Sequence, residues 1–272
     1  MKFTYFDIHG HVNFPEYDAD REEVIARAQA AGVGLVTVGT DLESSGQAIK
    51  LAETHENMWA IVGVHPVHTA ESHHGPAAAF DHEAFKKLAV HPKVIAIGEC
   101  GLDYFHSKPE EIAHQREVFL QHIQLANETK KPLMLHVRNA KADPKNPGQV
   151  GPSAYQDAVA LLKEHAKVPV NFHFFAGTID DAKAILDIGG TMSFTGVLTF
   201  ARNYDEVVKY IPLECMMSET DCPYVAPIPY RGQRSEPVHT IEVVKAIAKI
   251  RGDDEEEVRV QIRENVRRVF GI

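Results

Sequence analysis

Two histidines separated by one glycine are the first residues of this chain that could do chemistry. His9 and His11 follow directly on an apolar run near the start of the sequence. In an extended chain, residues i and i+2 point to the same side, so both imidazole rings can reach one ion. Such a pair also occurs without function. Its position just after a predicted strand makes it a candidate metal site.

A second candidate is Glu99, which lies in the stretch VIAIGECGLD at residues 94–103. Residues 94–97 are apolar and mostly β-branched, which predicts a strand buried on both faces and ending before Gly98. A carboxylate this close to a buried strand needs a partner or a metal, because burying an isolated charge is prohibitively costly. The simpler alternative is that Glu99 caps the loop and faces water. We predict instead that Glu99 bridges two divalent metal ions.

Three more side chains of metal-ligand type lie at or near the ends of other predicted strands, namely His136, His173 and Asp221. A single histidine on an apolar strand is often a hydrogen-bonded core residue, but two on successive strands favour a site. The closure of a barrel would bring Asp221 next to His9 and His11. The same closure would set Glu99 beside His136 and His173.

These six residues divide into two expected sites that share Glu99. His9, His11 and Asp221 would surround one ion, and His136 and His173 the other. Imidazole and carboxylate ligands without thiolate suit Zn, Mn, Mg or Fe, and the sequence does not choose among them. Two ions about 4 Å apart are the arrangement used for in-line displacement at phosphorus.

Eight predicted strands alternate with helices and must position these residues. The strands are expected at residues 3–8, 33–39, 58–64, 94–97, 133–137, 169–174, 190–194 and 213–218. The helices are expected at residues 20–31, 42–55, 81–90, 109–129, 153–165, 178–187, 203–210, 238–250 and 255–269. This alternation predicts an α/β fold with a parallel sheet closed into a single-domain (β/α)8 barrel over residues 1–272. An open doubly wound sheet is the alternative, but no glycine-rich phosphate loop follows the first strand.

The composition limits the classes of function. The chain has 272 residues, of which 44% are hydrophobic and 24% charged, and no run is long and apolar enough to span a membrane. Three scattered cysteines do not make a disulfide framework, which predicts a cytoplasmic protein. The net charge of −10 argues against a general basic surface for nucleic acid. It leaves phosphate substrates open, since bound ions and local arginines can reverse the sign within one cleft.

The whole chain resembles the TatD family of metal-dependent hydrolases. The segments that carry the resemblance occur in the family's order: DIHGH, GVHP, IGECGLDY, LHVR, HFFAG, ETDCPYVAPIPYRG and RENVRRVF. The resemblance implies a TIM barrel of the metallo-dependent hydrolase type that holds one or two divalent metals and hydrolyses DNA from strand ends. The residues that match the family's metal ligands are His9, His11, Glu99, His136, His173 and Asp221. His65 and Arg138 match positions near the substrate.

The sequence departs from the family pattern at three places. Phe174 and Phe175 follow the sixth-strand histidine, where Cys or Ser is more common, and Val67 follows the proline of GVHP, where a histidine is usual. Residues 139–152 form a longer Pro/Gly-rich stretch beside His136. It is either a tolerated surface insertion or a lip that shapes the substrate site. These changes leave the ligand set intact and bear on substrate identity.

We therefore predict a metal-dependent phosphodiesterase, a deoxyribonuclease of the 3'-5' exonuclease type, with DNA or another phosphodiester as substrate. Asp221 would orient or deprotonate the attacking water, with Glu99 as the other catalytic carboxylate. His65, Arg138 and Arg231 would bind the substrate. The two arginines suit this role because a guanidinium group can bind two phosphate oxygens at once.

Two alternatives remain open from the sequence. The same site could hydrolyse a carboxylic ester, amide or lactone, although enzymes of that kind often bridge their ions with a modified lysine where this chain has Glu99. The chain could also be a non-catalytic metal-containing binding protein, but the complete set of expected metal ligands argues against this. No protein or membrane partner is inferred.

Overall fold

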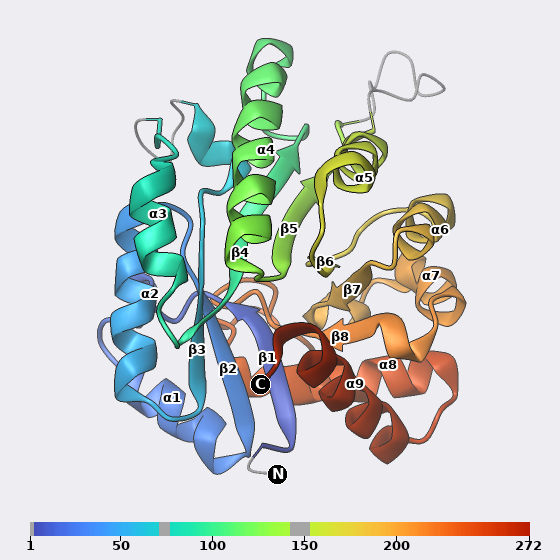
Figure 1. Cartoon of the computed structure of the whole chain (residues 1–272). Helices are drawn as coiled ribbons and strands as arrows, with labels where there is room; N and C mark the ends of the chain where they lie inside the picture. Colours follow the sequence, from blue (N-terminus) through green and yellow to red (C-terminus); the bar gives the residue numbers. More distant parts are fainter. Residues whose placement is uncertain (1–2, 71–76, 142–152) are drawn as a thin grey trace.

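Eight parallel strands follow one another around a nearly closed barrel in the computed structural model, which describes residues 3–70, 77–141 and 153–272 (Figure 1). The strands are β1 Tyr5–Gly10, β2 Val33–Val38, β3 Met58–Val62, β4 Val94–Asp103, β5 Leu133–Arg138, β6 Val170–Phe172, β7 Thr191–Phe194 and β8 Met216–Ser218. Each strand pairs in parallel with the next. The ring is completed by side-chain and loop contacts between β8 and β1, among them Asp221 N donating to His9 O at 2.8 Å. The predicted (β/α)8 barrel is confirmed.

Helices alternate with the strands and surround the barrel (Figure 1). They are α1 Arg21–Ala30, α2 Leu42–Thr54, α3 His82–Ala89, α4 Ile112–Thr129, α5 Ala154–His165, α6 Ile179–Asp187, α7 Asp205–Tyr210, α8 Thr240–Arg251 and α9 Glu255–Phe270. Several begin at a side chain that accepts a hydrogen bond from the first turn, as at Asp41, Ser153 and Thr178. Such caps are short-range signals, which is why the predicted bounds lie close to the observed ones.

Strand β4 continues past the point where the sequence predicts its end. The prediction stopped at Ile97, whereas β4 runs on to Asp103 and pairs with β5 as far as Arg138. Gly98 and Gly101 have φ of +153° and +135°, and a Cβ at either position would clash with a backbone carbonyl oxygen of β5. The glycines therefore allow the close approach of the two strands rather than ending β4. Glu99 lies within the strand and not after it.

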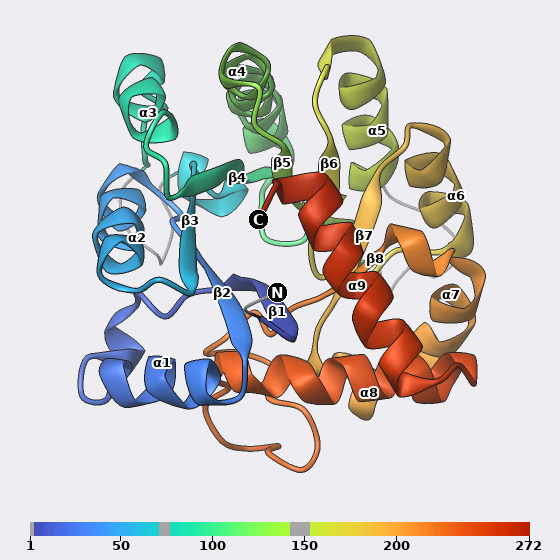
Figure 2. The same ribbon diagram turned by 60° about the horizontal axis from the view of Figure 1, so that its bottom comes forward.

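Helix α9 closes one end of the barrel. Its residues Val266, Val269 and Phe270 pack against Phe6 and Ile8 of β1 in an apolar cluster inside the barrel. Figure 2 shows α9 crossing this end of the molecule. A second, larger apolar cluster fills the space between the barrel and the helices. With one end plugged, the carboxyl ends of the strands form the accessible mouth.

Two further sequence predictions concern the Pro/Gly-rich stretch and the absence of a membrane span. Residues 142–152 of the Pro/Gly-rich stretch lie outside the described residues. Among the helices that the structure does describe, none is both long and apolar enough to cross a membrane.

Candidate metal centre

Glu99 lies at the centre of a group of buried and partly buried imidazoles at the mouth of the barrel. Its Oε1 atom is 2.8 Å from His173 Nε2, 3.0 Å from His136 Nδ1 and 3.2 Å from His65 Nε2. The Glu99 side chain is only 4% exposed. One carboxylate oxygen therefore faces three ring nitrogens that come from three different strand ends.

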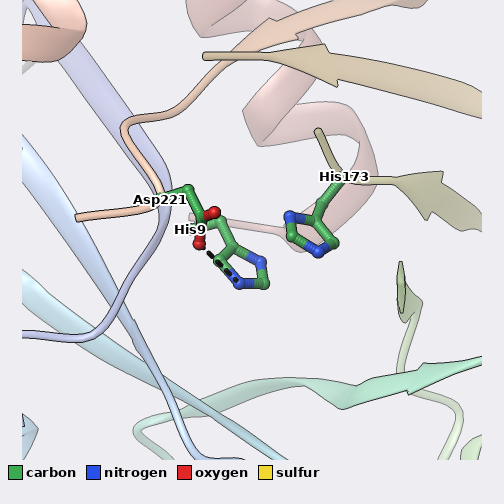
Figure 3. Close-up of side chains that lie close together, drawn as sticks. All are labelled: His9, His173 and Asp221. Carbon is green, nitrogen blue, oxygen red and sulfur yellow. Dashed lines mark ion pairs between the residues drawn. The ribbon is translucent and has the colours of Figure 1, made fainter. Parts of the chain in front are cut away.

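The second oxygen of Glu99 faces the other predicted ligands. Its Oε2 atom is 3.3 Å from His9 Nε2 and 3.8 Å from His11 Nε2. Asp221 Oδ1 lies 3.5 Å from His11 Nε2 and 3.9 Å from His9 Nε2. Figure 3 shows the side chains of His9, Asp221 and His173 close together. The rings of His9 and His173 are stacked, with their centroids 3.8 Å apart. The barrel thus brings all six residues of the predicted ligand set into one cluster.

The outward-facing nitrogens of two of these rings donate hydrogen bonds to oxygen. His11 Nδ1 lies 3.0 Å from Val38 O, and because a carbonyl can only accept, the ring must donate there. His173 Nδ1 lies 3.2 Å from Glu219 Oε1, which also accepts from the backbone N–H of Phe174 at 2.7 Å. Each Nε2 is then left with its lone pair facing the cluster, which is the form that binds metal.

His136 is oriented by a carboxylate that the sequence analysis missed. Asp103 Oδ2 accepts from His136 Nε2 at 2.9 Å and from His106 Nδ1 at 2.9 Å. Burial alone would raise the pKa of Asp103, but these hydrogen bonds outweigh it and hold that pKa well below its usual value. The signal was available, since Asp103 follows Glu99 by four residues in one strand and alternation puts both on the same face.

His9 gives a direct test of whether the cluster fits a metal. Both of its ring nitrogens are buried and make no hydrogen bond, although Nε2 lies close to Glu99. A buried polar atom without a partner is costly, and most such atoms in folded proteins are satisfied. A cation among His9, Glu99 and Asp221 would satisfy the inward nitrogen of His9. The residues present fit a divalent metal ion.

Both carboxylates of the cluster are held in the ionised form. Burial alone would raise the pKa of Glu99, but its electrostatic interactions with the imidazole rings around it outweigh that effect and bring the pKa well below the usual value. The pKa of Asp221 is also lowered, because its hydrogen bond to His11 and the nearby histidines overcome the effect of burial. Burial lowers the pKa of His65 to about 4, so this imidazole is neutral at neutral pH.

The loop that carries Asp221 is anchored to β1 by another carboxyl group. Asp7 Oδ1 accepts from Thr220 N at 2.8 Å, and Asp7 Oδ2 lies 2.6 Å from Thr220 Oγ1. Burial raises the pKa of Asp7 well above its usual value. Asp221 itself has φ of +53°, a conformation that is uncommon for a residue other than glycine and often found at functional sites. Asp7 thus positions Asp221, a role that the sequence analysis did not assign.

The structure groups the possible ligands differently from the division expected from the sequence. Among the residues that the structure describes, three sets lie close enough to hold an ion: His9, His173 and Asp221; His9, His11 and Glu99; His65, Glu99 and His136. His173 therefore shares a possible ion site with His9 and Asp221, whereas the sequence analysis paired it with His136. His65, which was not among the expected ligands, shares a possible ion site with Glu99 and His136. Glu99 belongs to two of the three sets.

The predicted substrate residues lie around this cluster. Arg138 and Arg231 are on the surface, with their guanidinium groups over the rings of Phe105 and Phe200 at 3.9 Å and 4.0 Å. Two other arginines in segments that follow strands have carboxylate partners. Arg234 binds Asp20 through two hydrogen bonds of 2.8 Å and 2.6 Å.

The second of these arginines, Arg202, lies 3.5 Å from Asp205. Of the aromatic residues in the segments that follow strands, Tyr104 and Phe175 are buried in the core, and Tyr230 is stacked on His239. Tyr224 is 50% exposed and keeps an accessible face.

Comparison with known proteins places these observations in a family context. The sequence model of the family described as TatD related DNase matches residues 6–271. A Bacillus subtilis protein described as the uncharacterized metal-dependent hydrolase YabD is 37% identical over 273 residues, covering 98% of this chain and 99% of the relative. The 3'-5' ssDNA/RNA exonuclease TatD of Klebsiella pneumoniae is 34% identical over 279 residues, with 98% of each chain covered. The crystal structure of YjjV, a TatD homologue of Escherichia coli, superimposes over 100% of both chains with a TM-score of 0.84 at 24% identity.

Proposed function

The chain belongs to the TatD family of metal-dependent hydrolases, and from this premise we propose that it is a phosphodiesterase that degrades DNA as a 3'-5' exonuclease. The observation that carries the proposal is the cluster around Glu99, where buried imidazole nitrogens converge on one carboxylate. The Klebsiella relative described as a 3'-5' ssDNA/RNA exonuclease supports the same reaction class.

We propose that the cluster holds two divalent ions and that Glu99 contributes one oxygen to each. The proposed ligands are His9, His11, Glu99, His136, His173 and Asp221. When bound, the ions would supply positive charge that polarises the phosphodiester and makes a water molecule easier to deprotonate. Zn, Mn, Mg and Fe all remain candidates, because imidazole and carboxylate ligands accept each of them.

Asp221 is the proposed proton acceptor for the attacking water. Its lowered pKa keeps it ionised at neutral pH, and its side chain is 14% exposed, so water can reach it. Asp7 holds the preceding residue, Thr220, and so fixes the direction from which Asp221 meets the substrate. Glu99 is the second proposed catalytic carboxylate, and its lowered pKa also keeps it ionised at neutral pH.

His65, Arg138 and Arg231 are the proposed substrate-binding residues. His65 is neutral and lies 3.2 Å from Glu99, so it can donate a hydrogen bond to a phosphate oxygen in the cluster. Arg138 and Arg231 form no ion pair with a carboxylate in the described part of the chain, which leaves their charge for the substrate. Such a site fits a phosphodiester better than an uncharged ester or amide.

Two further proposals concern the protein as a whole. We propose that residues 1–272 act as one domain, which is supported by the single continuous sheet to which all eight strands belong. We also keep the prediction of a cytoplasmic location, which rests on the low number of cysteines in the sequence.

The proposed function is tested by incubating the metal-reconstituted protein with 3'-labelled and 5'-labelled single-stranded DNA. A carboxylic ester is supplied in a separate reaction as the substrate of the alternative function. We expect release of nucleotides from the 3' end and at least about 100-fold slower release by the Asp221→Asn variant. Glu164→Gln, a change at an exposed residue of α5, is the matched control. Absence of nucleotide release with Mg, Mn, Zn and Co would overturn the nuclease proposal, and faster hydrolysis of the ester would favour the alternative.

A further inference from the structure

A chain of buried polar side chains runs through the interior of the barrel on β6 and β7. Asn171 of β6 and Ser193 of β7 are both fully buried, and Asn171 Nδ2 donates to Ser193 Oγ at 3.0 Å. Asn171 Nδ2 also lies 3.4 Å from the sulfur of Met134, which belongs to the apolar cluster inside the barrel. Polar atoms in such a place are costly unless they are hydrogen-bonded. Their presence where apolar side chains could pack points to a role other than packing.

The hydrogen bonds of this chain run in one direction. Thr191 Oγ1 lies 3.0 Å from Asn171 Oδ1, which can only accept, and the amide nitrogen of Asn171 donates to Ser193. Ser193 Oγ therefore accepts one hydrogen bond and has its own proton left to donate. It donates to Glu219 Oε2 at 2.5 Å. The chain thus ends at a carboxylate in the segment that follows β8.

Glu219 connects this chain to the metal cluster. Its side chain is 0% exposed, and its Oε1 atom accepts from His173 Nδ1 at 3.2 Å and from Phe174 N at 2.7 Å. Phe174 has φ of +43°, a backbone conformation that is rare for a bulky residue and persists only where the surroundings enforce it. Glu219 therefore holds both the ring of His173 and the turn that carries this ring. The same ring lies close to His9 and Asp221 (Figure 3).

Ser193 fixes the other oxygen of this carboxylate. Within the described residues, no other group donates a hydrogen bond to Glu219 Oε2. A carboxylate that is held through one oxygen alone can turn about its last bond, and Oε1 would then lose its alignment with His173 Nδ1. Loss of the Ser193 hydroxyl would also leave a buried carboxylate oxygen without a partner, which costs more than the hydrogen bond itself contributes.

We infer that Ser193 is a positioning residue of the metal centre, which acts through Glu219 to keep the Nε2 atom of His173 directed at the cluster. The inference rests on the proposed metal-dependent function and adds a residue of β7, a strand that supplies none of the proposed ligands. Outer partners of this kind fix the ring orientation of metal-binding histidines, and their loss weakens metal binding by about 10- to 100-fold.

The first test compares two buried serines that differ in their partners. Ser218 of β8 is also fully buried and directly precedes Glu219, but its hydroxyl donates to Phe6 O at 3.2 Å. We expect Ser193→Ala to weaken Zn binding, measured in competition with a chelator, by at least about tenfold, and Ser218→Ala to stay within about twofold of the unmodified protein. Thermal melts confirm that each variant is folded. Equal affinity of the two variants for Zn would overturn the inference.

A double-mutant cycle tests whether Ser193 acts through Glu219. The variant Glu219→Leu replaces the carboxylate with a side chain of similar size that cannot form hydrogen bonds. Adding Ser193→Ala to this variant should change its Zn affinity by less than about twofold, because the link to His173 is already broken. Losses of affinity that multiply in the double variant would show that Ser193 acts by another route and would overturn the inference.

A third measurement needs no metal. In the metal-free protein, the proton on His173 Nδ1 is buried and hydrogen-bonded to Glu219, so it should give a downfield signal in the proton NMR spectrum. The absence of this signal from His173→Gln assigns it. We expect the signal to be kept in Ser218→Ala and to move upfield or disappear through exchange in Ser193→Ala.

An unchanged signal in Ser193→Ala would overturn the inference, as would its absence from the unmodified protein. Failure of the unmodified protein to bind Zn would instead contradict the proposed function. The NMR signal of the metal-free protein would still decide whether Ser193 orients His173.

Discussion

Asp103 Oδ2 lies 2.9 Å from Nε2 of His136, on the side of the ring that faces away from Glu99. The ionised carboxylate accepts a hydrogen bond from the N–H group at Nε2, so the ring proton stays there and Nδ1 is unprotonated, 3.0 Å from Glu99 Oε1. Asp103 is not one of the proposed ligands, yet its hydrogen bond determines which nitrogen of His136 can bind a cation.

The substitution Asp103→Asn should damage the centre without unfolding the protein. An amide N–H in place of Oδ2 would donate to His136 Nε2 and move the ring proton to Nδ1, where it points at Glu99. We expect metal affinity, measured by titration calorimetry, to fall by about 10- to 100-fold.

Asp157→Asn is the matched control for this change, because Asp157 accepts from Tyr104 outside the cluster. Unchanged affinity in Asp103→Asn, with the control also unchanged, would show that Asp103 does not set the tautomer of His136.

Asp7 should tolerate replacement by asparagine. Burial raises the pKa of Asp7 and so favours the neutral carboxyl group, and asparagine can accept from Thr220 N in the same place. Asp7→Ala leaves the buried N–H of Thr220 without a partner, which should lower the free energy of unfolding by about 1–3 kcal/mol. Urea denaturation of the two variants checks this. Equal destabilisation by asparagine and alanine would mean that Asp7 is ionised in the folded state.

His122 should make the protein less stable in acid. Its Nε2 accepts from Val64 N at 2.9 Å and its Nδ1 donates to Val118 O at 2.8 Å, so the buried ring is neutral. Burial lowers its pKa from 6.5 to about 4. The unfolded chain therefore holds one more proton between these values, and the stability present above pH 6.5 is lost as the pH falls towards 4. The loss from this group is about 3 kcal/mol.

Thermal melts at a series of pH values test this contribution. His122→Gln should be less stable at neutral pH but show a shallower decline between pH 6.5 and 4, whereas His114→Gln, at an exposed position, should keep the original slope. An unchanged slope in His122→Gln would assign the acid sensitivity to other groups.

Removal of metal should lower the melting temperature. The ions would bind the folded cluster and not the separated residues of the unfolded chain, so they stabilise the fold by mass action. At a concentration about 100-fold above the dissociation constant, we expect a rise of about 5 °C or more over the chelated protein. Differential scanning fluorimetry with Mn, Zn and Mg additions measures it. An identical melting temperature with and without each metal would contradict a specific site.

The barrel was predictable because its signals are local. Alternating apolar strands and capped helices, such as the one that begins after Thr178, fixed the number and order of the elements. The end of β4 was predicted wrongly, because Gly98 resembles a stop signal in the sequence while in the fold it allows contact with Met134.

The inner residues of the centre were also predictable, whereas their outer partners were not. His9, Glu99 and Asp221 are of metal-ligand type and lie in strands or just after them, so their convergence follows from the closure of the barrel. Asp7 and Asp103 act through hydrogen bonds to Thr220 and His136, and such pairing depends on the register between strands. The sequence does not specify that register.

The most direct test of the account is the number of metal ions that each chain holds. Inductively coupled plasma mass spectrometry of protein reconstituted with Zn or Mn and then desalted should give about two ions per chain. Glu99→Gln should retain at most one, because the NH2 group that replaces one carboxylate oxygen cannot bind an ion and the remaining carbonyl oxygen is uncharged, while Glu164→Gln should match the unmodified protein. A metal-free unmodified protein, or an undiminished content in Glu99→Gln, would contradict the claim that Glu99 joins two ions.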